Sequence, residues 1–189
     1  MSEQLISFEL ETDLLMALES LSESLIKVKN GRVNYLKWSL IFAHTALQSA
    51  MCLSLITSAT FLVRKRSSYG DSSGDLDNVE WLYKKLQKSD FLPYVGSKNI
   101  PTVDGELSEV QRLQTIRNTF IHQQPDLYVF TFEELYELIL LAVKLSRFLI
   151  SESDRMSLGV NVNKTVLENQ LELIESQLTR QLNGTKTVG

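Results

Sequence analysis

Apolar residues recur every three or four positions along most of this chain, and this spacing constrains the fold more than any other feature. Residues at such intervals share one stripe of an α-helix, which packs against another surface to leave water. The first stripe consists of Leu14, Leu18, Leu21, Leu25 and Val28. The last consists of Leu167, Leu171, Ile174, Leu178 and Leu182. No convincing period of two is present, so the sequence predicts an all-α protein, an antiparallel up-and-down helical bundle. The two narrow stripes suit pairing with each other or with a second subunit.

Turn and capping residues divide this pattern into separate helices. Asn30-Gly31 closes the first helix, and a long second helix is expected over about residues 33–66. A third is expected over about 76–89 and a fifth over about 131–156. Three pairs with capping-box spacing mark the starts of the last three helices: Ser108 with Gln111, Thr131 with Glu134, and Thr165 with Glu168. The fourth helix must end before Pro125.

The length of 189 residues is enough for one domain to bury a core of its own. We therefore expect a single helical domain over residues 1–189, with 160–189 as a C-terminal helical appendage. Net charge is −4, so any nucleic-acid binding must rest on a local basic patch. The N-terminus lacks the features of a signal peptide, and the apolar run 50–63 is too short and too rich in hydroxyls to span a bilayer. These features predict a cytoplasmic protein without a membrane partner.

One segment carries residues suited to chemistry on phosphodiesters. It is Arg117-Asn118-Thr119-Phe120-Ile121-His122, at the expected end of the fourth helix. The guanidinium of Arg117 offers a planar fork of donors suited to phosphate, and the imidazole of His122 can exchange a proton near neutral pH. The two side chains lie roughly 140° apart around an ideal helix, so the last turn must loosen if both are to enter one cleft.

The motif and the helical layout resemble the HEPN superfamily. Its hallmark is an arginine, four to six intervening residues and a histidine, with a polar residue commonly following the arginine; here Arg117, Asn118 and His122 match. The resemblance covers roughly 33–156 and implies a HEPN-like four-helix core with extra N- and C-terminal helices. It also implies a metal-independent endoribonuclease whose site forms between two subunits.

The function that this resemblance implies is RNA cleavage by a homodimer, as a toxin or defence component with a cognate antitoxin or partner protein. In it, His122 is the general acid or base, Arg117 stabilises charge on the phosphate, and Asn118 orients the histidine or the substrate. The toxins that a nucleotidyltransferase modifies carry a tyrosine two residues after the histidine. Gln124 stands there in this chain, which puts that regulation in doubt.

Each of these features also has a plainer interpretation. An arginine and a histidine in the last turn of a helix interact favourably with its carbonyls and dipole. Under that interpretation the chain is a catalytically inactive helical bundle that binds a partner protein or nucleic acid. Neither His44 nor His122 has an acidic or thiol residue at ligand spacing, so we expect no metal site and no cofactor.

Two further sets of polar residues are candidates for nucleic-acid binding. Lys37, His44 and Gln48 form one polar stripe of the second helix, which either lines the same groove and contacts RNA or is a solvent-facing edge. The second set is basic and consists of Arg64, Lys65, Arg66, Lys84, Lys85 and Lys88. These side chains either grip a phosphate backbone or simply complement helix C-termini, and the sequence favours the second interpretation.

Overall fold

The computed structural model describes residues 9–56, 60–68, 74–88, 90, 92, 98–122, 128–152 and 162–185. Its α-helices are α1 (Leu10–Lys29), α2 (Tyr35–Leu55), α3 (Val79–Leu86), α5 (Glu106–His122), α6 (Phe132–Glu152) and α7 (Lys164–Thr185). Two short 3₁₀ helices, η1 (Thr60–Val63) and η2 (Arg66–Ser68), follow α2. Within these ranges the only β pairing is one isolated bridge between Arg64 and Leu76. The predicted all-α helical bundle is confirmed.

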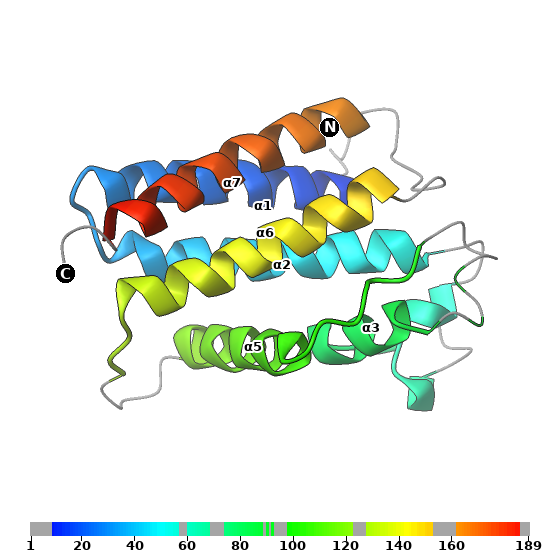
Figure 1. Cartoon of the computed structure of the whole chain (residues 1–189). Helices are drawn as coiled ribbons and strands as arrows, with labels where there is room; N and C mark the ends of the chain where they lie inside the picture. The colour runs from blue at the N-terminus through cyan, green and yellow to red at the C-terminus, as the bar shows by residue number, and fades with distance from the viewer. Residues whose placement is uncertain are drawn as a thin grey trace, which may run out of the picture.

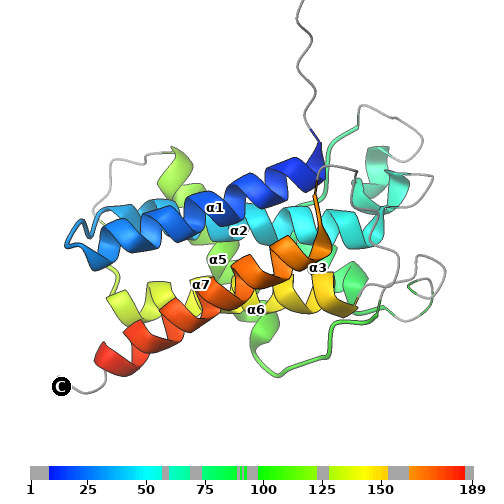
Figure 2. The ribbon, with the colours of Figure 1, turned by 90° about the horizontal axis from the view of Figure 1, so that it is seen from above.

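The helices lie in layers (Figure 1). The α1 and α7 helices cover α2 and α6, and α3 and α5 lie on the opposite side of that pair. The α1 and α2 helices are antiparallel, as are α6 and α7, whereas α2 and α6 run in the same direction. Seen from above, α5 passes beneath the α2–α6 layer (Figure 2). The start of α5 is held to α3, where Tyr83 donates a hydrogen bond to the carboxylate of Glu106.

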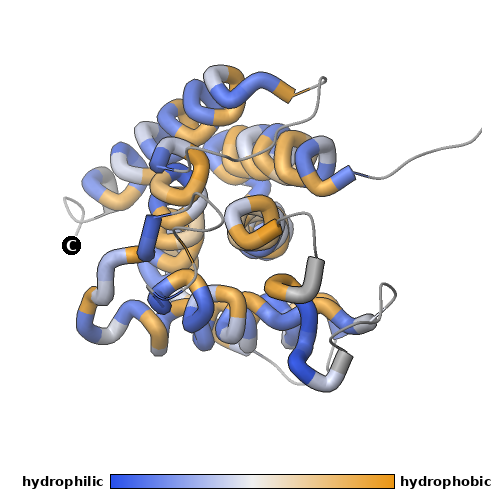
Figure 3. Tube along the Cα trace, turned by 90° about the vertical axis from the view of Figure 1, so that its right-hand side faces the viewer, coloured by the Kyte–Doolittle hydropathy of each residue, from blue (hydrophilic) through white to orange (hydrophobic). Residues whose placement is uncertain are grey.

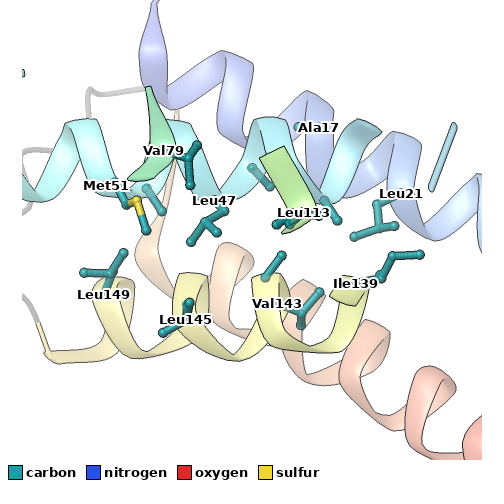
Figure 4. Packing of buried hydrophobic residues seen from close by; sticks show 14 of the residues in the cluster. Ala17, Leu21, Leu47, Met51, Val79, Leu113, Ile139, Val143, Leu145 and Leu149 are labelled. Atoms are coloured by element: carbon teal, nitrogen blue, oxygen red, sulfur yellow. The ribbon is translucent and has the colours of Figure 1, made fainter. Parts of the chain in front are cut away.

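The α2 helix is the centre of the bundle. It packs against α1, α6, α3, α5 and η1, and residues around most of its circumference are buried. Hydrophobic segments turn inward between the helices (Figure 3), and side chains such as Leu47, Leu113 and Val143 meet there (Figure 4). Because α2 touches both layers, polar residues on it are enclosed wherever α5 and α3 cover them.

Local chemistry determines several helix ends, and of the three predicted capping boxes only the one before α6 is formed. Gly31 has a φ of 85° after α1, a left-handed conformation that glycine adopts without a side-chain clash. The capping box before α6 is confirmed, since Thr131 N–H donates to Glu134 at 2.8 Å and Glu134 N–H donates to Thr131 at 3.1 Å. Ser108 is not a cap: α5 already begins at Glu106, after Gly105 with a φ of 82°, and the Ser108 hydroxyl donates back to the Gly105 carbonyl at 2.6 Å.

The start of α7 lies one residue before the predicted cap. The N–H of Thr165 donates to the side chain of Asn163 at 2.9 Å, so Asn163 satisfies a donor of the first turn.

The second and third helices are shorter than predicted. The α2 helix ends at Leu55, not near residue 66, and Ile56 already has extended backbone angles. Hydroxyl side chains crowd this end of the helix, and they compete for backbone hydrogen bonds, as Ser54 does with the Ala50 carbonyl at 2.9 Å. The α3 helix begins at Val79 because Asn78 caps it, accepting from Trp81 N–H at 3.0 Å.

The two narrow apolar stripes are both buried within this one chain. All five stripe residues of α7 are buried, and α7 packs along α6 and against α1. Arg147 of α6 adds an ion pair with Glu175 of α7 at 3.0 Å. Since both stripes are buried inside the bundle, a homodimer would have to use another surface.

Candidate functional site

Arg117 is held at the C-terminal part of α5 by its neighbour. Its Nη1 donates to Asn118 Oδ1 at 3.0 Å, and the same oxygen accepts from Gln114 Nε2 at 3.1 Å. Gln114 and Asn118 are four residues apart and therefore neighbours on one helix face. Arg117 is half-buried, and its Nε is enclosed without a hydrogen-bond partner in the described part of the chain. Burial lowers the pKa of Arg117, although a guanidinium stays charged at neutral pH.

The network continues from α5 to α2 through His44. The ring Nε2 of His44 lies 2.9 Å from Gln114 Oε1. Because the amide nitrogen of Gln114 is used on Asn118, its oxygen faces the ring, and His44 Nε2 is the donor. Burial lowers the pKa of His44 to about 4; the bond to Gln114 opposes this shift and the charge of Arg117 adds to it. His44 is therefore neutral at pH 7, and its Nδ1 is buried without a partner among the described residues.

His44 is 1% exposed, so the expected solvent-facing edge on α2 is wrong at this position. The stripe instead faces the layer that α5 and α3 form. Lys37 Nζ lies 5.8 Å from the centre of the Phe120 ring, and Gln48 Nε2 donates to the Asp77 carbonyl at 3.4 Å. The structure thus joins His44 to the Arg117–Asn118 pair through Gln114. Lys37 instead lies near the C-terminal part of α5, and Gln48 lies near the start of α3.

His122 is the last residue of α5 and is exposed. The α-helix continues through His122, so the loosened last turn that would bring it to Arg117 is not formed. Residues five apart on such a helix stay roughly 140° apart in azimuth. No hydrogen bond joins the two side chains in the described structure, and the predicted stop at Pro125 and the departure at Gln124 lie outside the described residues. Within one chain, the three motif residues therefore do not form a single cluster.

Sequence reasoning overlooked Gln114, which links the two helices. Its position three before Arg117 and four before Asn118 places all three on neighbouring parts of one helix surface, which was the available signal. It also overlooked aromatic contacts at the end of α5. Phe120 meets Phe130 edge to face at 5.7 Å between ring centres, and Tyr128 stacks on Phe130 at 6.4 Å. These contacts join the C-terminal part of α5 to the residues just before α6.

The described residues contain no cluster of three or more His, Cys, Asp or Glu side chains that could hold a metal ion. One helix, α2, is long and apolar enough to cross a membrane by length and composition, and most of it is buried inside the bundle. The apolar side chains of α2 pack against the helices around it.

No family model matches this sequence, and neither the curated proteins nor the solved structures searched gave a match. The resemblance to the HEPN superfamily therefore depends on Arg117, Asn118, His122 and the order of the helices.

Proposed function

We propose that this protein is a HEPN-like, metal-independent endoribonuclease that acts as a toxin or defence component. The observation that supports it most is the pre-positioned arginine. A half-buried Arg117 whose Nη1 is fixed by Asn118 has lost much of its side-chain freedom before any substrate arrives. A guanidinium held in this way can stabilise charge on a phosphate without reorganising during the reaction.

His122 is the proton-transfer group in this proposal. It is exposed at the end of α5 and can therefore approach a 2′-hydroxyl or a leaving oxygen of RNA. His44 has a different role, because it is buried and neutral. It positions Gln114, which in turn fixes Asn118.

A second copy of the chain completes the proposed site. Arg117 turns toward α2 while His122 projects from another side of α5, so one subunit alone does not present both to one phosphate. Apolar side chains near the end of α5 are available for an interface, including Trp38, which is 48% exposed, and Val129, which is 83% exposed. Across such an interface His122 of one subunit would approach Arg117 of the other.

One observation favours a different function, a catalytically inactive bundle that binds a partner protein or nucleic acid. The network of His44, Gln114, Asn118 and Arg117 ties α5 to α2, which is a sufficient structural reason for these residues. The two functions differ in what the loss of His122 does, because His122 is outside this network.

The test is cleavage of a fluorogenic single-stranded RNA by the purified protein in EDTA. We expect cleavage that Arg117→Ala and His122→Ala each reduce by about 10²-fold or more, with unchanged helix content. Thr115→Ala is the matched control, since it is exposed on the same helix and its hydroxyl only bonds the Gln111 carbonyl. Absence of cleavage, or equal cleavage by wild type and His122→Ala, would leave the binding protein as the better description.

Light scattering tests the shared site independently. We expect a dimer, which Trp38→Asp converts to a monomer with little RNA cleavage. A wild-type monomer that cleaves RNA at full rate would contradict a site formed between two subunits.

A further inference from the structure

Basic side chains from two separate segments line one large pocket. The pocket has a volume of about 1080 Å³. It is lined by Lys65 and Arg66, which follow η1, and by Trp81, Lys84, Lys85 and Lys88 on or just after α3. We call it the basic pocket. Its lining contains five cations and one carboxylate, Asp77, in a chain whose net charge is −4. The positive charge is therefore concentrated locally.

Backbone pairing brings these two segments together. Lys65 N–H donates to the Asp75 carbonyl at 3.0 Å, and Asp77 N–H donates to the Val63 carbonyl at 2.9 Å. Lys85 fastens the junction: its ammonium donates to the Leu62 carbonyl at 2.8 Å and to the Arg64 carbonyl at 3.0 Å, and it pairs with Asp77. Lys85 thus holds the two segments of the pocket together, and Asp77 neutralises the charge of Lys85.

Three of the other cations, Lys65, Arg66 and Lys88, are open to a ligand, whereas Lys84 pairs with Glu80 at 2.6 Å. Arg66 and Lys88 are exposed and form no ion pair within the described structure. Lys65 pairs with Asp75 at 2.9 Å, but both side chains are largely exposed, and such a pair contributes little free energy. A phosphate could therefore replace Asp75 at Lys65 with little loss.

Trp81 adds an aromatic face to this set of cations. It is 54% exposed, although it lies on a helix whose opposite face is buried. The ammonium of Lys84 lies 4.6 Å from the centre of its ring. Cations that follow a phosphate backbone, together with an exposed aromatic ring, form the combination that binds single-stranded nucleic acid, because every base can stack.

We propose that the basic pocket binds single-stranded RNA, with Lys65, Arg66 and Lys88 on phosphates and one base stacked on Trp81. The choice of RNA over other nucleic acids rests on the proposed function. Trp81, Lys84 and Lys85 of the basic pocket lie on α3, and α5, whose start is bonded to α3, extends about 25 Å from there to His122. The bound segment is therefore distinct from the phosphodiester at the Arg117 motif, and the pocket holds a strand rather than performing chemistry.

The experiment measures fluorescence anisotropy of a labelled single-stranded RNA with His122→Ala protein, so that the probe is not cut. We expect Arg66→Glu with Lys88→Glu to weaken binding by about tenfold or more and to flatten its salt dependence. Lys144→Glu with Arg180→Glu is the matched control, with the same charge change at exposed sites on other helices. Equal loss in both double variants would overturn the proposal.

Trp81 supplies a second, independent measurement. The chain has two tryptophans, so in a Trp38→Phe background the intrinsic emission reports Trp81 alone. We expect RNA to quench this emission and Trp81→Leu to weaken RNA binding by about tenfold. If adenosine monophosphate binds as tightly as the RNA strand, the pocket is a nucleotide site and the proposal is wrong.

The outcomes separate this proposal from the ribonuclease. RNA binding that depends on Arg66 and Lys88 in a protein that cuts no RNA would support the pocket and contradict the ribonuclease. The reverse result would be RNA cleavage that depends on His122, together with equal binding and cutting of the RNA by the wild type and the Arg66→Glu, Lys88→Glu variant. That result would support the ribonuclease and contradict the pocket.

Discussion

His44 shows how one buried side chain connects the candidate site to the stability of the fold. It lies between α2 and α5, donates to Gln114 and leaves its Nδ1 without a partner in the described structure. Burial disfavours the charged form of His44, and protonation would also place a second positive charge near Arg117. His44 therefore binds a proton less readily in the folded protein than in the unfolded chain.

This difference predicts a pH dependence of stability. The pKa of His44 falls from 6.5 to about 4 on folding, so the unfolded state binds more protons between these values. The free energy of unfolding should therefore fall as pH drops from 6.5 toward 4, by at most about 1.4 kcal/mol per pH unit from this residue. Urea unfolding of wild type and His44→Gln at pH 7, 6, 5 and 4.5 measures it.

Glutamine keeps a donor for Gln114 but cannot take up the proton. His44→Gln should therefore show a smaller loss of stability over this range, while the carboxylates contribute equally to both proteins. Parallel pH profiles for the two proteins would contradict the buried neutral histidine.

At the scale of the helices, the capping boxes differ although their sequences look alike. Before α6, the backbone N–H of Thr131 donates to the Glu134 carboxylate and the backbone N–H of Glu134 donates to the Thr131 hydroxyl. Glu134 also pairs with Arg112 of α5 at 2.6 Å. Ser108 lies inside α5, where its hydroxyl bonds the Gly105 carbonyl. The capping-box spacing therefore forms a cap only where the helix begins directly after its first residue, as at Thr131, and not where the helix has already begun, as at Ser108.

Alanine substitutions distinguish the two positions. Thr131→Ala should lower the free energy of unfolding by about 1 kcal/mol, because a first-turn N–H loses its acceptor. Ser108→Ala should change it by less than about 0.5 kcal/mol, because the residue is an exposed position within a helix. Chemical denaturation monitored by circular dichroism measures both. A larger loss for Ser108→Ala would contradict the helix start at Glu106.

At the scale of the whole molecule, α7 is packed like the rest of the bundle. Its apolar stripe is buried against α6 and α1 and is therefore not available to a second subunit. Because α7 shares its core with α6 and α1, we expect it to unfold together with the rest of the bundle and not as a separate segment.

Truncation of the α7 stripe tests this cooperativity. Leu171→Ala in α7 and Leu47→Ala in α2 remove side chains with no exposed surface, so each should lower the free energy of unfolding by about 2–5 kcal/mol in one shared transition. Leu173→Ala, whose side chain is 48% exposed on the same helix, is the control and should have little effect. A separate early transition for Leu171→Ala would instead make α7 an independent appendage.

The sequence by itself determined the features that depend on neighbouring residues. The helical class, the close of α1 at Gly31 and the cap at Thr131 follow from spacing and hydrogen bonds within a few positions. It also identified Arg117, Asn118 and His122 as a motif. It could not determine the end of α2, where hydroxyl side chains compete with the backbone in a run without proline or glycine.

Only the tertiary structure decided which distant side chains meet. Gln114 touches His44, 70 positions earlier in the chain, because α5 packs on α2, and the same packing buries the histidine. Backbone pairing likewise brings Arg66 and Lys88 to one pocket, although the sequence favoured separate roles at two helix ends. Periodicity specifies which face of a helix is buried, but the partner of that face depends on how all the helices share one core.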